Sequence, residues 1–568
     1  MTVGFPVLSL LIFIPIVAAV IILFLPRDSK DLIRGIAIAA ALAVLGLGLF
    51  VYGAYNQNVG NITAAQDTII DADGESVATT MYAETLQFEE YVMWVPQLGI
   101  AYHLGVDGLS VPMVLLTSMV TVTGVLISWR IDDRTREFMA FFLLLVAGVF
   151  GVFVANDMFV LFFFYELAIF PMYLLIATWG WVKLREYAAM KLTLYILIGS
   201  VVALVGVIAM VITANNFFLA EGAQAFANAK SSGLLPADAT EFSFSITQLT
   251  LAAEAGAFNL PFLGDVSFAE LWFPFIFIGF GVLAGVFPFH NWSPDGHVAA
   301  PTAVSMIHAG VLMKVGAYAA LRAGVQLMPE GAQVHLPWIV FLTLINVVYG
   351  AFIAFRQRDF KYVIGFSSVS HMGLVSMGWA TLNMTGMTGA GLQMFSHGAM
   401  TALFFGCVGM VYDRAHTRDI PSLGGFIKVM PWVGLAFIVG GLTSMGMPGL
   451  SGFVAEFTIF QGMFIASDQI VLNLGAFQLT NYYSVLVVIA ALGIVITAAY
   501  VLRVTSQVFF GEFDRQKYPE VDDITPRERV VLLLLGVPLL ILGVYPQIMS
   551  PMIETGLRPV LAILGVGA

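Results

Sequence analysis

Long hydrophobic runs alternate with short polar segments through almost the whole chain. A run of about 20 residues is long enough for a helix to cross the roughly 30 Å hydrocarbon core of a bilayer. The pattern predicts fourteen spanning helices, at residues 4–25, 35–55, 104–129, 138–155, 158–178, 187–213, 271–290, 301–322, 336–355, 361–380, 389–412, 430–465, 482–508 and 530–550. The predicted fold class is therefore an all-α polytopic membrane protein.

Two of these runs predict helices that are broken inside the membrane. The run 430–465 is too long for one simple helix, and it contains Met447-Pro448-Gly449. The run 271–290 is rich in glycine and reaches Pro288 near its end. A break at this depth is tolerated where the freed backbone groups face protein or a water-filled cavity. We therefore expect both breaks to line an internal polar region.

Composition agrees with this pattern and excludes several functions. The chain of 568 residues is 59% hydrophobic and only 11% charged, with a mean hydropathy of +0.92. Its one cysteine, Cys407, excludes an internal disulfide and any cluster or zinc site built on several thiolates. The net charge of −12 does not favour nucleic-acid binding, and no dinucleotide or Walker-type loop is present. We expect no cofactor in this chain.

The distribution of basic residues predicts the orientation. When the N-terminus is placed outside and the spans alternate, 20 of the 24 Lys and Arg residues fall on the inward side, as expected for cytoplasmic loops. The exceptions are Lys230, Arg322 and Arg558 on the outward side and Lys314 within a span. Both termini are thus predicted to lie outside.

The long loops are polar on both sides. The outward loops 56–103 and 214–270 are acidic and rich in small residues. We expect them to form a solvated cap of short helices or hairpins without chemistry. The inward loop 509–529 has mixed charge and is expected to meet the cytosol or a partner.

Few ionisable residues fall inside the predicted spans. An isolated charge at the bilayer centre costs at least about 2.5–3.5 kcal/mol on insertion scales, so such residues are kept for a function. Acidic, basic and histidine side chains distributed over several helices are typical of a proton relay. The residues are Glu166, Lys191, His308, Lys314, His371, His397 and Glu456.

Each of these residues also has a structural explanation that the sequence leaves open. Glu166 and Lys314 could be static charges between helices. Lys191 lies near the inward end of its span, where it could extend to the headgroups. Glu456 could tie the broken segment together, and the histidines could be core residues bonded to backbone.

Five segments together resemble the antiporter-like membrane subunits of respiratory complex I, which are related to the large subunits of Mrp-type Na⁺/H⁺ antiporters. The segments are residues 156–180, 288–319, 358–375, 412–420 and 447–457. Within this family, GVDGLS at 105–110 and DRAHTRDI at 413–420 favour the M-type subunits of bacterial NADH–quinone oxidoreductase, the counterpart of mitochondrial subunit 4. The resemblance covers roughly residues 100–510.

The resemblance implies a fold of about 14 transmembrane helices. Helices 4–8 and 9–13 would form two inverted five-helix repeats, each with one broken helix. The implied organisation has four parts: 1–136, with helices 1–3; 137–322, the first repeat; 336–508, the second repeat; and 509–568, with the inward loop and helix 14.

The resemblance also implies a function and its residues. The family role is proton translocation without a redox cofactor, coupled to quinone reduction elsewhere in the complex. The implied partners are L-type and N-type antiporter-like subunits, the lipid bilayer and protons, and the implied location is the bacterial inner membrane. The positions that match the family's proton-transfer residues are Glu166, Lys191, Lys314, His371 and Glu456.

One position departs from the family pattern. The family has a lysine in a K-x-P pattern in the broken seventh helix, seven residues before the histidine that corresponds to His290. Here that position is Leu283, and Gly285 replaces the proline. Because the usual partner of Glu166 is missing, we hypothesise that His308 or Lys191 takes its place.

Three alternatives remain open at this point. The first is a cation/proton antiporter subunit of the Mrp type. The second is the equivalent subunit of a membrane-bound hydrogenase or ferredoxin-linked complex. The third is a structural membrane-arm subunit with a disabled channel, which the leucine at position 283 favours.

Overall fold

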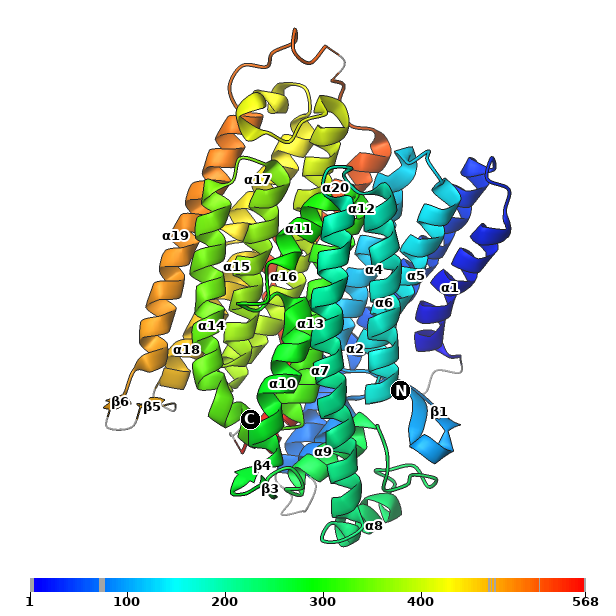
Figure 1. Cartoon of the computed structure of the whole chain (residues 1–568), viewed down its shortest axis with the longest axis vertical. Coiled ribbons are helices and arrows are strands. Elements are labelled where there is room, and N and C mark those ends of the chain that lie inside the picture. The colour runs from blue at the N-terminus through cyan, green and yellow to red at the C-terminus, as the bar shows by residue number, and fades with distance from the viewer. Residues whose placement is uncertain are drawn as a thin grey trace.

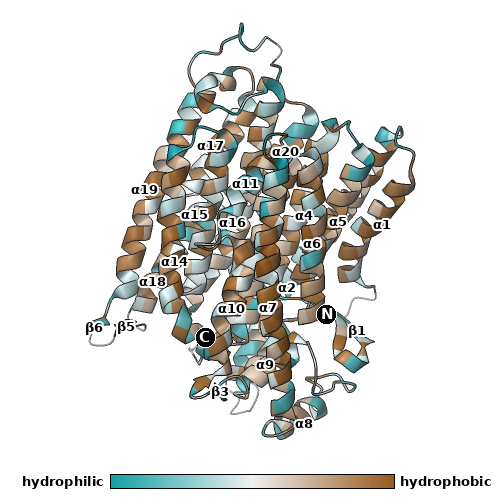
Figure 2. Ribbon diagram, in the orientation of Figure 1, coloured by the Kyte–Doolittle hydropathy of each residue, from teal (hydrophilic) through white to brown (hydrophobic). Residues whose placement is uncertain are grey.

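Long helices run side by side along the long axis of the molecule (Figure 1). The computed structural model describes residues 5–565 apart from 71–76, 468–469, 471, 475–476 and 520. Hydrophobic residues dominate the long helices, whereas hydrophilic residues gather at the two ends (Figure 2). This is the arrangement that the hydrophobic runs predict.

The first half of the bundle contains six long helices. Helices α2 and α7 are 41 and 34 residues long and extend beyond the runs that predicted them. The helices are α1 (Val7–Phe24), α2 (Lys30–Ile70), α4 (Ser110–Ile127), α5 (Thr135–Val154), α6 (Met158–Trp179) and α7 (Arg185–Phe218).

The next helices include both predicted breaks. The run 271–290 forms α10 (Phe268–Ala284) and α11 (Trp292–Ala299), and the run 430–465 forms α17 (Pro431–Ser444) and α18 (Ser451–Ser467). A nearly continuous helix consists of α12 (Thr302–Ile307), the π-helical η3 (His308–Leu312), α13 (Met313–Ala319) and the π-helical η4 (Ala320–Gln326). The remaining helices are α14 (Pro329–Arg356), α15 (Phe360–Trp379), α16 (Met384–Ala415), α19 (Tyr482–Phe509), α20 (Pro526–Val544) and α21 (Ser550–Ile563).

Short elements form a cap at one end of the bundle. The expected hairpin is present, because β1 (Gln87–Val95) pairs antiparallel with β2 (Ile100–Val106). The start of the run 104–129 is thus a strand and not a helix. The other short elements are α3 (Val77–Thr85), α8 (Ala223–Ser231), α9 (Ile246–Glu254), β3 (Pro261–Leu263), β4 (Val266–Ser267), β5 (Leu472–Leu474) and β6 (Phe477–Leu479). The 3₁₀ turns, which do not all belong to this cap, are η1 (Pro96–Leu98), η2 (Ser128–Arg130), η5 (Ile420–Ser422), η6 (Phe426–Lys428) and η7 (Pro546–Ile548).

Polar segments lie at both ends of the bundle. The strands β1, β3 and β4 and helix α8 lie at the lower end in Figure 1. The loop after α19 lies at the opposite, upper end, where hydrophilic residues are concentrated (Figure 2). The acidic loops and the mixed-charge loop are therefore on opposite sides, as expected.

The helical membrane fold is confirmed. In the part of the chain that the structure describes, ten helices are long and apolar enough to cross a membrane by length and composition. The broken helices contribute α10 and α17 as shorter apolar pieces. The total of fourteen, the inverted repeats and the four-part division stay predictions.

Neighbouring helices satisfy the backbone at the first break. Gly285 ends α10 with φ +79°, a conformation that glycine adopts without strain. The Asn346 side chain of α14 donates to the Gly285 carbonyl at 2.8 Å and accepts from the Phe287 amide at 2.6 Å. The Trp292 indole donates to the Val282 carbonyl at 3.0 Å. Side chains of the protein thus satisfy backbone groups that the break leaves without helical partners.

Two helices form the centre of the bundle. The apolar windows of the helix 302–326 and of α16 are completely buried, whereas fewer than half of the window residues of α7 and α19 are buried. The peripheral helices would face lipid or a partner. Ionisable residues on the two central helices therefore have only protein around them.

Candidate functional site

Lys314 lies at the middle of the molecule without exposure. It follows the π-helical turn η3, and its Nζ donates to the Ala309 carbonyl at 2.5 Å. Turns of π-helix inside α-helices are frequent at functional sites, because they change which carbonyls are available. The same Nζ lies 2.8 Å from Nδ1 of His397 on α16. The amine and the imidazole can therefore exchange a proton directly.

A second imidazole continues this contact. The ring of His371, on α15, stacks on the ring of His397, and the two ring centroids are 5.3 Å apart. Nε2 of His371 lies 2.9 Å from the Ser444 hydroxyl, and Gln393 lies 3.2 Å from its Nδ1. These contacts hold the ring between the central helices and the second broken helix.

Glu456 ends this row of side chains. One of its carboxylate oxygens lies 3.2 Å from Nδ1 of His371, and both side chains are 3% exposed. The other faces the second break, where a Cβ added at Gly446 would lie only 2.8 Å from it. Gly446 has φ +64°, so only glycine leaves room for the carboxylate. The break thus positions an acid at the end of the row Lys314–His397–His371–Glu456.

His308 forms a separate pair with His297, on α11. The two ring centroids are 4.1 Å apart and both residues are completely buried. Trp292 stacks on His308 at 5.2 Å. The Ser293 hydroxyl lies 3.0 Å from Nε2 of His297. The pair is located where the first broken helix meets the helix of Lys314.

Lys191 pairs with an acid on the first broken helix. Its Nζ donates to Asp295 of α11 at 2.7 Å, and the Tyr362 hydroxyl of α15 donates to the other oxygen at 2.8 Å. Both members of the ion pair are about one-fifth exposed. The sequence left open that Lys191 extends to the lipid headgroups. In the structure, Lys191 pairs with Asp295 instead.

Glu166 is partly exposed on α6. Its polar neighbour is the Ser200 hydroxyl of α7, and its Oε1 accepts no hydrogen bond from the described residues. The expectation that Lys191 or His308 pairs with it is wrong for this structure. Lys191 is held by Asp295 and His308 stacks with Trp292 and His297, so neither forms an ion pair with Glu166 within the described chain.

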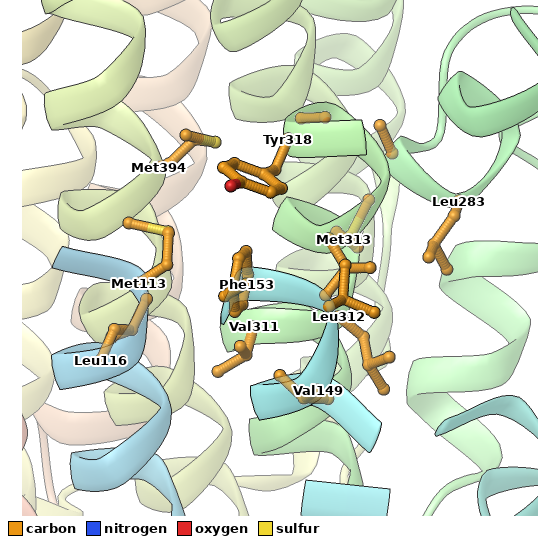
Figure 3. Close-up of a cluster of buried hydrophobic side chains, with 14 of the residues drawn as sticks. Met113, Leu116, Val149, Phe153, Leu283, Val311, Leu312, Met313, Tyr318 and Met394 are labelled. Carbon is orange, nitrogen blue, oxygen red and sulfur yellow. The ribbon is translucent and has the colours of Figure 1, made fainter. Parts of the chain in front are cut away.

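Leu283 lies in a hydrophobic cluster. Figure 3 shows it beside Leu312 and Met313 among buried hydrophobic side chains. The backbone of α10 approaches this helix closely, because a Cβ at Gly316 would lie 2.5 Å from the Ala284 nitrogen. The leucine thus replaces a family amine with an apolar side chain next to the helix of Lys314.

The structure brings together some predicted site residues and separates others. Lys314, His371 and Glu456 belong to one row, whereas Glu166, Lys191 and His308 belong to separate clusters. Sequence reasoning missed Asp295 and His297, because residues 291–300 read as a loop between two spans. It also discounted His397, which is the contact between Lys314 and His371. The short interval between two hydrophobic runs was the available signal for a buried half-helix.

No metal centre is indicated by the geometry. Within the described ranges, no group of three or more His, Cys, Asp or Glu side chains could hold a metal ion. The row of Lys314, two imidazoles and Glu456 contains groups that bind and release protons. Proton transfer is the chemistry that this arrangement supports.

Comparison with known proteins places the chain in a family. The family model described as NADH:quinone oxidoreductase/Mrp antiporter, TM, matches residues 155–480. The chain belongs to this family. The NAD(P)H-quinone oxidoreductase chain 4 1 of Synechococcus elongatus is 35% identical over 544 residues, covering 96% of this chain and 89% of that one. Subunit M of the NADH-quinone oxidoreductase of Rhodobacter capsulatus is 35% identical over 472 residues, covering 82% and 83%. The resemblance inferred from the motifs is confirmed.

Solved structures of this antiporter family share the fold. A chain of respiratory complex I from Thermus thermophilus superposes with a TM-score of 0.76 at 23% identity, covering 99% of this chain and all of that one. A chain of the Mrp complex from Dietzia has a TM-score of 0.71 at 19% identity, with 98% and 99% covered. The fold is thus common to a chain of respiratory complex I and a chain of an Mrp complex, so the fold alone does not distinguish their functions.

Proposed function

We propose that this chain is a proton-translocating membrane-arm subunit of an NADH–quinone oxidoreductase. It carries no redox cofactor and moves protons in response to quinone reduction elsewhere in the complex. The observation that carries the proposal is the buried row from Lys314 through His397 and His371 to Glu456. The relatives named subunit M and chain 4 support the redox-driven form.

Proton movement along the row follows from its chemistry. A neutral imidazole accepts a proton at one ring nitrogen and releases one from the other. His397 can take a proton from Lys314 at Nδ1. Because the stacked rings of His397 and His371 share no hydrogen bond in the described chain, a water between them would carry the proton on. His371 would then pass one to Glu456 from Nδ1, which faces the carboxylate. Charges in this buried region interact strongly because the dielectric is low. A change of charge at one end of the row therefore changes the proton affinity of the groups at the other end.

The proposed relay ends at the second broken helix, where Glu456 lies beside Gly446. At the first broken helix, Asp295 pairs with Lys191 of α7, outside the row. Glu166 lies on α6 beside the Ser200 hydroxyl, where in this proposal it senses charge from a neighbouring subunit. The proton then leaves from Glu456 to the outward side or to the adjacent subunit.

The peripheral helices support a place inside a larger assembly. Helix α7 exposes Met190, Ile198 and Val205 among other large apolar side chains. We propose L-type and N-type antiporter-like subunits as neighbours in the membrane arm, with lipid over the remaining surface. The proposed location is the bacterial inner membrane, with both termini on the outward side.

Replacing Glu166 with glutamine tests the proposed function. Glu166→Gln keeps the size of the side chain and the contact with Ser200 but cannot titrate. We expect quinone-coupled proton uptake into inverted membrane vesicles to fall sharply while the assembled complex remains. Since a positioned proton-transfer group contributes about 10²–10⁴-fold, a fall of about tenfold or more is expected.

Glu166→Asp is the matched control, because it retains the carboxylate and should retain much of the pumping. Normal pumping by Glu166→Gln would remove Glu166 from the mechanism. Sodium-dependent pH changes without quinone reduction would instead assign the chain to Mrp-type antiport.

A further inference from the structure

A hydrogen-bonded group of side chains at the outward end has no place in the row. His103 of β2 lies between Glu89 of β1 and Asn156, which comes just before α6. Nε2 of His103 lies 3.0 Å from a carboxylate oxygen of Glu89, and Nδ1 lies 3.2 Å from Nδ2 of Asn156. The His103 side chain is 7% exposed, whereas that of Glu89 is 49% exposed. The group therefore connects a buried imidazole to the surface.

An outward cavity gives water access to this group. It has a volume of about 630 Å³ and is lined by Glu84, Glu89, His103, Thr247 and other residues. Strand β1, which contributes Glu89, lies at the lower end of the molecule in Figure 1. A proton from water on the outward side can therefore reach the ring of His103 through this cavity.

The contacts of His103 fit a neutral ring. A carboxylate only accepts hydrogen bonds, and an amide nitrogen only donates them. The ring hydrogen is therefore on Nε2, facing Glu89, and Nδ1 accepts from Asn156, whose amide nitrogen is nearer to Nδ1 (3.2 Å) than to Nε2 (3.4 Å). In a charged imidazole both ring nitrogens donate. A proton on Nδ1 would thus set one donor against another.

The Asn156 amide cannot turn without losing other bonds. Its Oδ1 accepts from the Tyr82 hydroxyl at 2.8 Å, and its Nδ2 donates to the Thr247 hydroxyl at 3.1 Å. When Nδ1 of His103 carries a proton, Oδ1 of Asn156 has to face that nitrogen, so the Tyr82 hydroxyl loses its acceptor. Tyr82 and Asn156 are 3% and 1% exposed, so the lost bond leaves a buried hydroxyl unsatisfied.

The first consequence of this change concerns α6, the helix of Glu166. The main chain of Asn156 is tied to β2, because its amide donates to the His103 carbonyl at 2.8 Å. Asp157 then caps α6 and accepts from the Ala101 amide of β2 at 3.2 Å. A shift of Asn156 therefore moves the outward end of the helix that positions Glu166.

The second consequence concerns the helix of Lys314. The Arg322 guanidinium lies over the Tyr82 ring at 5.6 Å, and the face of an aromatic ring attracts a cation. Arg322 follows Lys314 by about two turns of the nearly continuous helix 302–326. A Tyr82 side chain that loses its bond to Asn156 changes its contact with Arg322. Because charges interact strongly in a low dielectric, a shift of this guanidinium changes the potential at Lys314.

Carboxylates around His103 would stabilise a positive ring. The titratable groups that face it are Glu89 and Tyr91 of β1, Glu84 of α3, Asp157 at the start of α6, and Asp238, which accepts from the Tyr91 hydroxyl. Burial raises the pKa of Asp157 to about 6, and a positive charge on His103 lowers it again. A proton on His103 therefore has acidic partners on two sides.

We propose that His103 and Asn156 form a switch that slows pumping when the outward side becomes acidic. With a neutral His103, the bonds of Asn156 hold α6 and Tyr82 in place. When protons accumulate outside, a hydronium ion in the cavity gives its proton to Nδ1 and is left as water, and Asn156 turns. The ring returns its proton to cavity water when the outward side becomes less acidic. The switch rests on the proposed function, because it regulates that pumping.

Acidifying only the outward side tests the switch. In inverted vesicles this side is the lumen, which is set to about pH 7.5 or about pH 5.5, on either side of the ordinary imidazole pKa of about 6.5. A potassium diffusion potential is adjusted so that the total force opposing pumping is equal in both settings. The unchanged complex should pump at least about threefold more slowly at the acidic setting.

His103→Gln should pump normally at the higher pH and keep that rate at the lower one. The glutamine amide can donate to Glu89 and accept from Asn156, as the neutral ring does, but it takes no proton. His335→Gln is the matched control. Nε2 of His335 lies 2.7 Å from the Glu270 carbonyl and its Nδ1 accepts from an indole, so it should slow like the unchanged complex.

Glu89→Gln provides a readout that packing alone would not change. The glutamine can still accept from Nε2 of His103 but lacks the charge that stabilises a positive ring. The pH at which pumping slows should therefore move lower by about half a unit. This shift decides the question even if His103→Gln fails to assemble.

Three results would overturn the switch. The unchanged complex could keep its rate with an acidic lumen, His103→Gln could slow as much as the unchanged complex, or Glu89→Gln could slow at the unchanged pH. Each would show that a proton on His103 does not control pumping. Glu456→Gln separates the levels: if it stops pumping in both settings while His103→Gln slows like the unchanged complex, the proposed function stands and only the switch is wrong.

Discussion

Glu456→Gln is expected to abolish or sharply lower proton pumping while the complex still assembles. Glutamine fills the same space beside Gly446 and can hydrogen-bond with His371, so the packing at the second break is retained. What is lost is the only carboxylate of the row. Because each proton has to leave His371 through this group, we expect a fall of about tenfold or more. The measurement is quinone-dependent acidification of inverted vesicles.

The control for this variant is Glu554→Gln. Glu554 is a partly exposed acid on α21 and has no place in the row. It should pump like the unchanged complex at equal content of the subunit. Vesicles in which Glu456→Gln pumps as well as Glu554→Gln would contradict the assigned role.

Arg322→Met is expected to cause the largest loss of stability. Arg322 forms an ion pair with Asp107, with side chains 1% and 2% exposed. The guanidinium also donates to Gln326 at 2.9 Å and lies over the Tyr318 ring at 5.0 Å. Removing one partner of a buried ion pair leaves an uncompensated charge and costs about 3–5 kcal/mol. Thermal unfolding of the purified complex and the amount of assembled subunit would measure this loss.

A surface ion pair offers a matched comparison. Arg558 pairs with Asp67, and these side chains are 22% and 58% exposed. Arg558→Met should cost at most about 1 kcal/mol. The double variant Asp107→Asn with Arg322→Met should lose less than the sum of its single variants, because no charge is left unpaired. Equal losses for Arg322→Met and Arg558→Met would show that the buried pair is not a stabilising element.

The helices themselves were largely predictable. A run of apolar residues long enough for a bilayer forms a helix whatever its neighbours are, since no other local structure satisfies its backbone there. The breaks at Gly285 and Gly446 were also signalled, by glycines and prolines inside hydrophobic runs. The end of β2 was not, because residues 104–106 read as the start of the apolar run 104–129.

The contacts between site residues were less predictable. A sequence shows which helix carries a charge but not which face meets another helix. Asp295 therefore was not recognised as the partner of Lys191. For His397 a core role was left open beside a role in a relay, although its Nδ1 contacts Lys314. The distribution of basic residues placed Arg322 on the outward side. In the structure, Arg322 belongs to the π-helical turn η4 and is buried in the core beside Asp107. These partners are distant in sequence and meet only through tertiary packing.

The proton-to-electron ratio of the complex carrying Lys314→Met tests whether the row Lys314–His397–His371–Glu456 carries protons. Methionine matches the length of lysine but leaves Nδ1 of His397 without its proton donor. The purified complex, reconstituted into liposomes, would be compared with the unchanged complex at equal quinone reduction. The account predicts a clearly lower ratio for Lys314→Met in a fully assembled complex. An unchanged ratio would contradict it and would leave this chain as a structural subunit of the membrane arm.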